Sequence, residues 1–142
     1  MSSHTNVNQE LKELKTQKEG LVYFIRHFDI EMIDSLLDDD KTYQDFPKYL
    51  FVQKLGHALD RFIAAGDTHL NSYTGTCSAE ICSMGCGGIR FIGNASGLYM
   101  DLIIKEEEGS VLDVYECHAF RTVSPKKTIA QKVWVDTKDL SV

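Results

Sequence analysis

The sequence predicts an α+β fold in which N-terminal helices pack on a curved antiparallel sheet, the architecture of a cystatin-like cone. Three observations support this prediction. Apolar residues recur at helical spacing through the first half of the chain, and strand formers separated by turn residues fill the second half. The length of 142 residues is the usual size of one domain. Helices followed by a meander of strands are typical of a layered fold, and we expect a cone-shaped cavity between the layers.

The first half of the chain is predicted to form helices. A polar segment over 7–18 is expected to be a frayed or docking helix. Apolar residues at helical spacing continue from Leu21 to Phe28. Asp29 is a suitable N-cap for a short helix that ends at the acidic run 38–40. A longer helix is expected from Phe46-Pro47 to Gly66, because proline is tolerated in a first turn and glycine favours helix ends.

Strand signals dominate the second half. We expect strands over 69–76 and 89–92, followed by a bend at 93–97. The next strand, over 98–105, alternates in sequence and is predicted to be half-buried, with a hairpin turn over 106–110 and a partner strand over 111–122. The last apolar stretch, 133–135, is interpreted as a short edge strand in preference to a helix.

Part of this pattern resembles a known group. The segment from Phe24 to Asp40, followed by Tyr43 and the helix to Gly66, is similar to the opening of the nuclear transport factor 2-like superfamily. The resemblance covers about residues 21–122. It implies a cystatin-like cone, polyketide cyclase-like and ketosteroid isomerase-like relatives, and a homodimer formed through the open face of the sheet. The Asp base and Tyr–Asp pair of the isomerases do not map residue by residue onto this sequence.

The expected organisation is one domain over 1–142. It is divided into an N-terminal helical extension over 1–20, a conical core over 21–122 and a C-terminal extension over 123–142.

A net charge of −6 argues against a general nucleic-acid binder, which would show a basic patch. No apolar run reaches membrane length, and residues 1–16 lack the apolar core of a secretion signal, so we expect a cytoplasmic protein with reduced thiols.

Four cysteines form the first candidate site. Cys77, Cys82 and Cys86 crowd a glycine-rich stretch, and Cys117 follows 31 residues later. Their spacing is close to that of zinc knuckles and predicts a closed, structural thiolate site, with His69 or His118 as substitutes for one thiol. This hypothesis predicts about one zinc per chain by elemental analysis and a lower melting temperature after Cys82→Ser. Buried unliganded thiols and a redox role remain open alternatives.

The second candidate site is a pocket inside the cone. Four residues could supply acid–base groups there: Tyr43, Asp101, Glu116 and His118. His118 is the best matched to neutral pH. Strict alternation places Glu116 and His118 on the same face as Leu112, so they line the cone if that face meets the helices, and a bulge would change the assignment. Packing, solvent exposure or a satisfied ion pair are the structural alternatives for these groups.

The preferred hypothesis is a small homodimeric protein that binds a small ligand or a protein partner in the cone, without a catalytic assignment. A zinc ion is the one cofactor considered, and Trp134 is interpreted as a core or interface residue. Two alternatives are kept. A cyclase- or isomerase-like enzyme would need a closed pocket with converging polar groups for a small apolar substrate. A thiol redox sensor would need exposed cysteines of low pKa.

Overall fold

The computed structural model describes residues 16–77, 88–116, 120–121 and 131–135. Within them lie three helices: α2 (Gln17–Arg26), α3 (Ile30–Leu36) and α4 (Lys48–Ala64). A short hairpin pairs β1 (Thr42–Tyr43) with β2 (Phe46–Pro47). The main sheet has five strands in the order β6-β5-β4-β3-β7: β3 (Leu70–Cys77), β4 (Gly88–Gly93), β5 (Tyr99–Glu107), β6 (Ser110–Glu116) and β7 (Phe120–Arg121).

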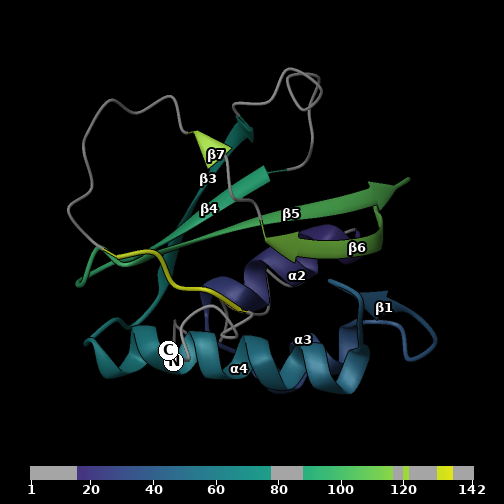
Figure 1. The fold of residues 1–142 in the computed structure, drawn as a ribbon, viewed down its shortest axis with the longest axis horizontal. Coiled ribbons are helices and arrows are strands. Elements are labelled where there is room, and N and C mark those ends of the chain that lie inside the picture. Colours follow the sequence, from purple (N-terminus) through teal and green to yellow (C-terminus); the bar gives the residue numbers. More distant parts are fainter. Residues whose placement is uncertain (1–15, 78–87, 117–119, 122–130, 136–142) are drawn as a thin grey trace, which may run out of the picture.

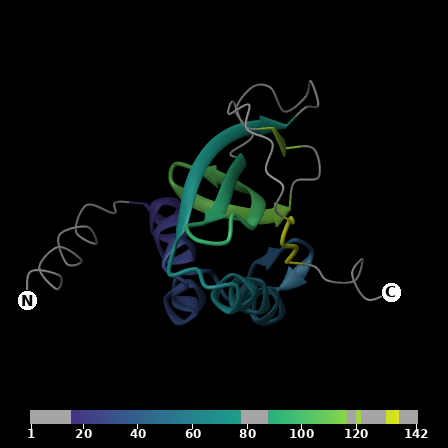
Figure 2. The same ribbon diagram turned by 90° about the vertical axis from the view of Figure 1, so that its left-hand side faces the viewer.

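The helices and the main sheet form two layers. Every pairing in the main sheet is antiparallel. Figure 1 shows α2, α3 and α4 on one side of the strands, and the turned view in Figure 2 shows β3 bending as it passes along the sheet. The prediction of an α+β fold with helices on a curved antiparallel sheet is therefore confirmed.

Local chemistry explains the helix boundaries. The Thr16 hydroxyl accepts a hydrogen bond from the N–H of Glu19 at 3.1 Å and caps α2. The Asp29 carboxylate accepts from the N–H of Met32 at 3.2 Å and caps α3, as predicted. After α4, Gly66 adopts a left-handed φ of +99°, which glycine tolerates without steric cost. Of the predicted helix over 7–18, residues 7–15 lie outside the described residues.

β3, β4 and β5 lie close to the predicted ranges, whereas the hairpin of β1 and β2 was not predicted. The turn between β5 and β6 consists of Glu108 and Gly109, both at positive φ, which is the geometry of a tight type I′ hairpin. Beyond it, the prediction of one partner strand over 111–122 is wrong. β6 ends at Glu116, and β7 pairs with β3 at the opposite edge of the sheet.

A bulge in β6 changes which side chains point toward the helices. Lys105 pairs with Asp113 and Glu106 pairs with Val111, so the intervening Leu112 has no partner in the ladder and is 43% exposed. Leu112 therefore does not meet the helices, and the bulge changes the assignment by strict alternation, an outcome that the prediction allowed for. Glu116 still lies on the inner face, opposite Leu102 of the core.

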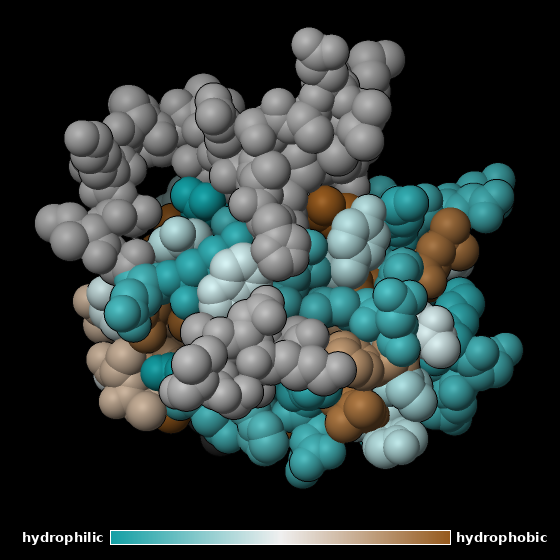
Figure 3. All heavy atoms as spheres, viewed as in Figure 1, coloured by the Kyte–Doolittle hydropathy of each residue, from teal (hydrophilic) through white to brown (hydrophobic). Residues whose placement is uncertain are grey.

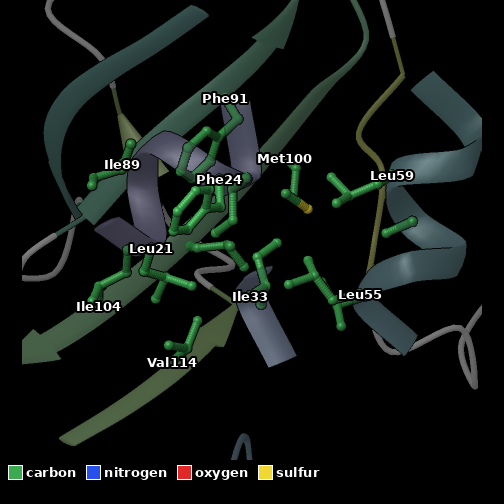
Figure 4. Packing of buried hydrophobic residues seen from close by; sticks show 14 of the residues in the cluster. Leu21, Phe24, Ile33, Leu55, Leu59, Ile89, Phe91, Met100, Ile104 and Val114 are labelled. Carbon is green, nitrogen blue, oxygen red and sulfur yellow. The ribbon is translucent and has the colours of Figure 1, made fainter. Parts of the chain in front are cut away.

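The described space between helices and sheet is filled by apolar side chains. Leu21 and Phe24 of α2 face Leu55 and Leu59 of α4, with Phe91 and Met100 of the sheet above them (Figure 4). All of these side chains are at most 7% exposed. Burial of this cluster is the main source of stability for the two layers.

The outer face of β5 is more buried than its alternating sequence predicts. Asp101 is 1% exposed and Ile103 is 4% exposed, although both lie on the face opposite the core residues Met100 and Leu102. The half-buried assignment of this strand is thus wrong over 101–104.

Elsewhere, hydrophilic residues cover most of the described surface visible in Figure 3 and separate the hydrophobic patches.

Candidate functional site

A buried carboxylate marks the outer face of the sheet. Asp101 of β5 pairs across the ladder with Arg90 of β4. Arg90 Nε lies 2.7 Å from Asp101 Oδ1 and its terminal Nη2 lies 3.0 Å from Oδ2, a bidentate pair. Lys132 Nζ adds a second cation 3.3 Å from Oδ2. Both oxygens of Asp101 are therefore bound to cations, which compensates the cost of burying its charge.

Residues 131–135, here called the C-terminal segment, run beside the start of β5. Among the described residues, the ladder between β5 and β6 reaches as far as Leu102 and Glu116. Tyr99 N–H donates to the carbonyl of Gln131 at 3.4 Å, and Val133 N–H donates to the carbonyl of Tyr99 at 2.6 Å. Figures 1 and 2 show this segment in yellow between the sheet and α4.

Side chains of the C-terminal segment join the core. Val133 and Val135 are 4% and 0% exposed and belong to the core cluster. The pairing of the segment is a single parallel bridge between Lys132 and Tyr99. The predicted edge strand over 133–135 is thus extended chain along β5, although it falls short of a regular strand.

Glu116 holds the same segment from the inner face. Its carboxylate accepts from the backbone N–H of Val135 through Oε1 and from the side-chain amide of Gln44 through Oε2, the latter at 3.0 Å. The Gln44 amide oxygen in turn accepts from the N–H of Glu116 at 3.2 Å. Gln44 lies at positive φ in the turn between β1 and β2. Its two hydrogen bonds with Glu116 therefore attach this hairpin to β6.

Asp101 and Glu116, the two buried acids of the sheet, both hold the C-terminal segment in place. Asp101 binds Lys132 and Glu116 binds the N–H of Val135, so both fix the C-terminal segment. They lie on opposite faces of the sheet and do not line one pocket. Among the described candidates, the residues predicted to converge in the cone are brought to different places.

Tyr43 occupies a third place, within the core beside the helices. It is fully buried, and its ring packs against Phe51 with centroids 5.6 Å apart. Burial raises the pKa of the phenol, and the N–H of Asp38, which donates to the phenol oxygen at 3.0 Å, opposes that shift in part. Tyr43 is thus a neutral core residue that packs the hairpin of β1 and β2 against α4.

The cysteine site cannot be placed by the described residues. Cys82, Cys86 and Cys117 lie outside them, as does the pocket candidate His118. The backbone of Cys77 forms the end of β3 and pairs with Phe120. Among the described residues, no three His, Cys, Asp or Glu side chains form a group that could hold a metal ion. The zinc hypothesis stays a prediction.

A groove opens between the last turns of α4 and the C-terminal segment. Its volume is about 480 Å³. We call it the ligand groove, and its lining residues are Arg61, Leu98, Gln131, Lys132, Val133 and Trp134. Lys132 Nζ lies 4.2 Å from the centre of the Trp134 ring, so the cation and the indole form one unit on the wall of the groove.

Sequence reasoning missed this groove because its parts come from three separated segments. Arg61 is an ordinary polar residue on the outer side of α4, and Trp134 was interpreted as a core or interface residue. The indole is half-buried. The sequence signal for this wall of the groove is Lys132, a cation two residues before the single tryptophan of the chain.

A second polar centre joins the turn after α4 to the turn between β4 and β5. Asp67, which is 5% exposed, accepts from the N–H groups of Ala95 and Ser96 at 2.7 Å each and from the Ser96 hydroxyl at 2.5 Å. Burial alone would raise the pKa of Asp67, but these hydrogen bonds outweigh it and lower the pKa below its ordinary value of 3.8. This fully bonded carboxylate holds the wall that carries Leu98.

Comparisons of the chain with protein-family models, with curated proteins and with solved structures found no match. The site must therefore be interpreted from its own geometry. None of the described helices is long and apolar enough to cross a membrane.

Proposed function

We propose that this protein binds a small molecule in the ligand groove and does not transform it. The observation that carries the proposal is the lining of the groove, which combines two cations, an indole ring and the apolar side chains of Leu98 and Val133. Its volume of about 480 Å³ lies in the range of small-molecule sites. A mostly apolar wall with a few polar groups is the usual composition of such a site.

The state of the buried acids supports binding in preference to catalysis. A general base needs a carboxylate oxygen that can reach a substrate proton. Both oxygens of Asp101 are bound to Arg90 and Lys132, and both oxygens of Glu116 accept from Gln44 and Val135. The described interior of the cone, where an apolar substrate would lie, is filled by the core cluster. We therefore place the ligand at the rim of the cone.

We also propose membership of the nuclear transport factor 2-like superfamily and assembly as a homodimer through the sheet. Support for the first comes from the order of elements, in which two helices, a short hairpin and a long helix precede an antiparallel meander. Support for the second comes from the aromatic side chains on the outer face, where Tyr73 is 50% exposed. Sedimentation velocity at several concentrations tests the dimer.

Binding in the groove can be tested with the dye 8-anilinonaphthalene-1-sulfonate. Because Trp134 is the single tryptophan of the chain and lines the groove, its emission responds to a dye bound there. We expect saturable binding of about one dye per chain, with energy transfer from Trp134 to the dye. The matched control is Lys105→Gln, which removes an exposed cation of β5 outside the groove and should leave both dye binding and energy transfer unchanged. Dye binding that does not saturate, or saturable binding without energy transfer, would refute the groove as the site.

A further inference from the structure

The charges around the ligand groove differ from those of the whole chain. The protein carries a net charge of −6, whereas among the described residues the lining of the groove includes two cations, Arg61 and Lys132, and no acid. Of these two cations, Lys132 is already bound to the carboxylate of Asp101, which Arg90 also binds. Arg61 is the other. A concave wall with charges of one sign attracts a ligand of the opposite sign.

Arg61 is suited to bind that ligand directly. It lies in the last turn of α4, and its side chain is half-buried at the edge of the groove. Within the part of the chain that the structure describes, no ion pair or hydrogen bond engages its guanidinium. A planar guanidinium binds a carboxylate with two parallel hydrogen bonds, which a lysine cannot reproduce.

Trp134 supplies the other half of the recognition. Its indole lies in the same lining as Arg61, beside the apolar side chains of Leu98 and Val133. Such a wall favours a flat, apolar ring over a flexible chain, because aromatic rings stack with little loss of conformational freedom. Lys132 contacts both the indole and Asp101, which fixes the ring against the sheet.

We infer that the ligand of this groove is a planar aromatic carboxylate, held by Arg61 at its acid group and by Trp134 at its ring. This inference rests on the proposed function. The guanidinium of Arg61 selects the acid, and the apolar wall selects the ring. Arg61 is the residue that determines the charge of the ligand.

Three probes of similar size test the inference by isothermal titration calorimetry. They are 2-naphthoate, the neutral 2-naphthamide and the saturated, non-planar decahydro-2-naphthoate. We expect 2-naphthoate to bind about 10-fold more tightly than either of the others, because each lacks one of the two recognised features. Equal affinity for naphthoate and naphthamide would overturn the role of charge. Equal affinity for naphthoate and decahydronaphthoate would overturn the role of the aromatic ring.

Variants assign the effect to Arg61. Arg61→Gln should remove the preference for naphthoate over naphthamide, and Arg61→Lys should keep part of it. The matched control Lys105→Gln removes an exposed cation from β5 and should leave all affinities unchanged. A preference that survives Arg61→Gln would overturn the inference. If the anilinonaphthalenesulfonate dye binds but the naphthalene probes bind with equal affinity, only the inference about the ligand fails. If neither the dye nor any probe binds, the proposed function fails too.

Discussion

Replacing Asp67 with alanine is expected to lower the free energy of unfolding by about 3 kcal/mol, because it removes a buried, ionised acceptor and leaves its donors unpaired. Three donors converge on this carboxylate: the N–H groups of Ala95 and Ser96 and the Ser96 hydroxyl. Urea denaturation measures the change. The matched control is Asp60→Ala, which removes an exposed carboxylate from α4 and should cost less than about 0.5 kcal/mol. Equal effects of the two substitutions would contradict the structural role of Asp67.

The same carboxylate predicts a pH dependence. The pKa of Asp67 in the folded protein lies below its ordinary value of 3.8, so the folded state binds its proton more weakly than the unfolded state. The stability that Asp67 contributes is therefore present above about pH 4 and is lost as the pH falls through the folded pKa. The difference in stability between the wild type and Asp67→Ala should shrink over that acidic range. A difference that stays constant down to pH 2 would refute this linkage.

Gly93 provides an independent check on Asp67. A Cβ added at Gly93 would overlap the carboxylate of Asp67, so Gly93→Ala must displace that group from its donors. We expect a cost of about 2 kcal/mol in the wild type and a much smaller cost in the Asp67→Ala background. The double-mutant cycle, measured by urea denaturation, gives this coupling. If the costs of Gly93→Ala and Asp67→Ala were additive, the added methyl group would not act through the Asp67 carboxylate.

Glu116→Ala is expected to have a second large effect, a loss of about 3 kcal/mol, because two buried donors lose a charged acceptor. These donors are the N–H of Val135 and the side-chain amide of Gln44, so the substitution releases the C-terminal segment and loosens the hairpin between β1 and β2. Hydrogen exchange should show faster exchange at the amides of Val133 and Val135. The emission of Trp134 should shift to longer wavelength as its ring meets water.

The matched control for Glu116 is Glu107→Ala, an exposed carboxylate at the end of β5. It should leave both the hydrogen exchange of the C-terminal segment and the emission of Trp134 unchanged. If Glu116→Ala lowered stability without changing the exchange of Val133 and Val135, the carboxylate would act on the hairpin alone. That result would contradict its role as an anchor of the C-terminal segment.

Local sequence signals predicted the parts of the fold that local chemistry determines. The cap at Asp29 and the turn at Glu108 and Gly109 follow from side-chain hydrogen bonding and from glycine geometry, which act over a few residues. The pairing of Phe120 with Cys77 could not be predicted in this way. It depends on how far the sheet curves, and that is set by packing over its whole width.

The candidate site was predicted less well than the fold. Glu116 lies on the inner face, opposite Leu102, but its partners Gln44 and Val135 are distant in sequence and carry no motif. Asp101 was predicted as a pocket residue, and its burial against Arg90 and Lys132 depends on the docking of the C-terminal segment. A pattern of alternating residues specifies a face of a strand and does not specify what covers it.

The position of the ligand tests the account most directly. Two-dimensional ¹H–¹⁵N NMR spectra of the protein titrated with 2-naphthoate report on each backbone amide and on the indole N–H of the single tryptophan. We predict that the largest shifts fall on the Trp134 indole, on the amides of residues 131–134 and on Leu98. Shifts concentrated on the core strands around Phe91 and Leu102, with the Trp134 indole unmoved, would place the ligand inside the cone and contradict the proposed groove.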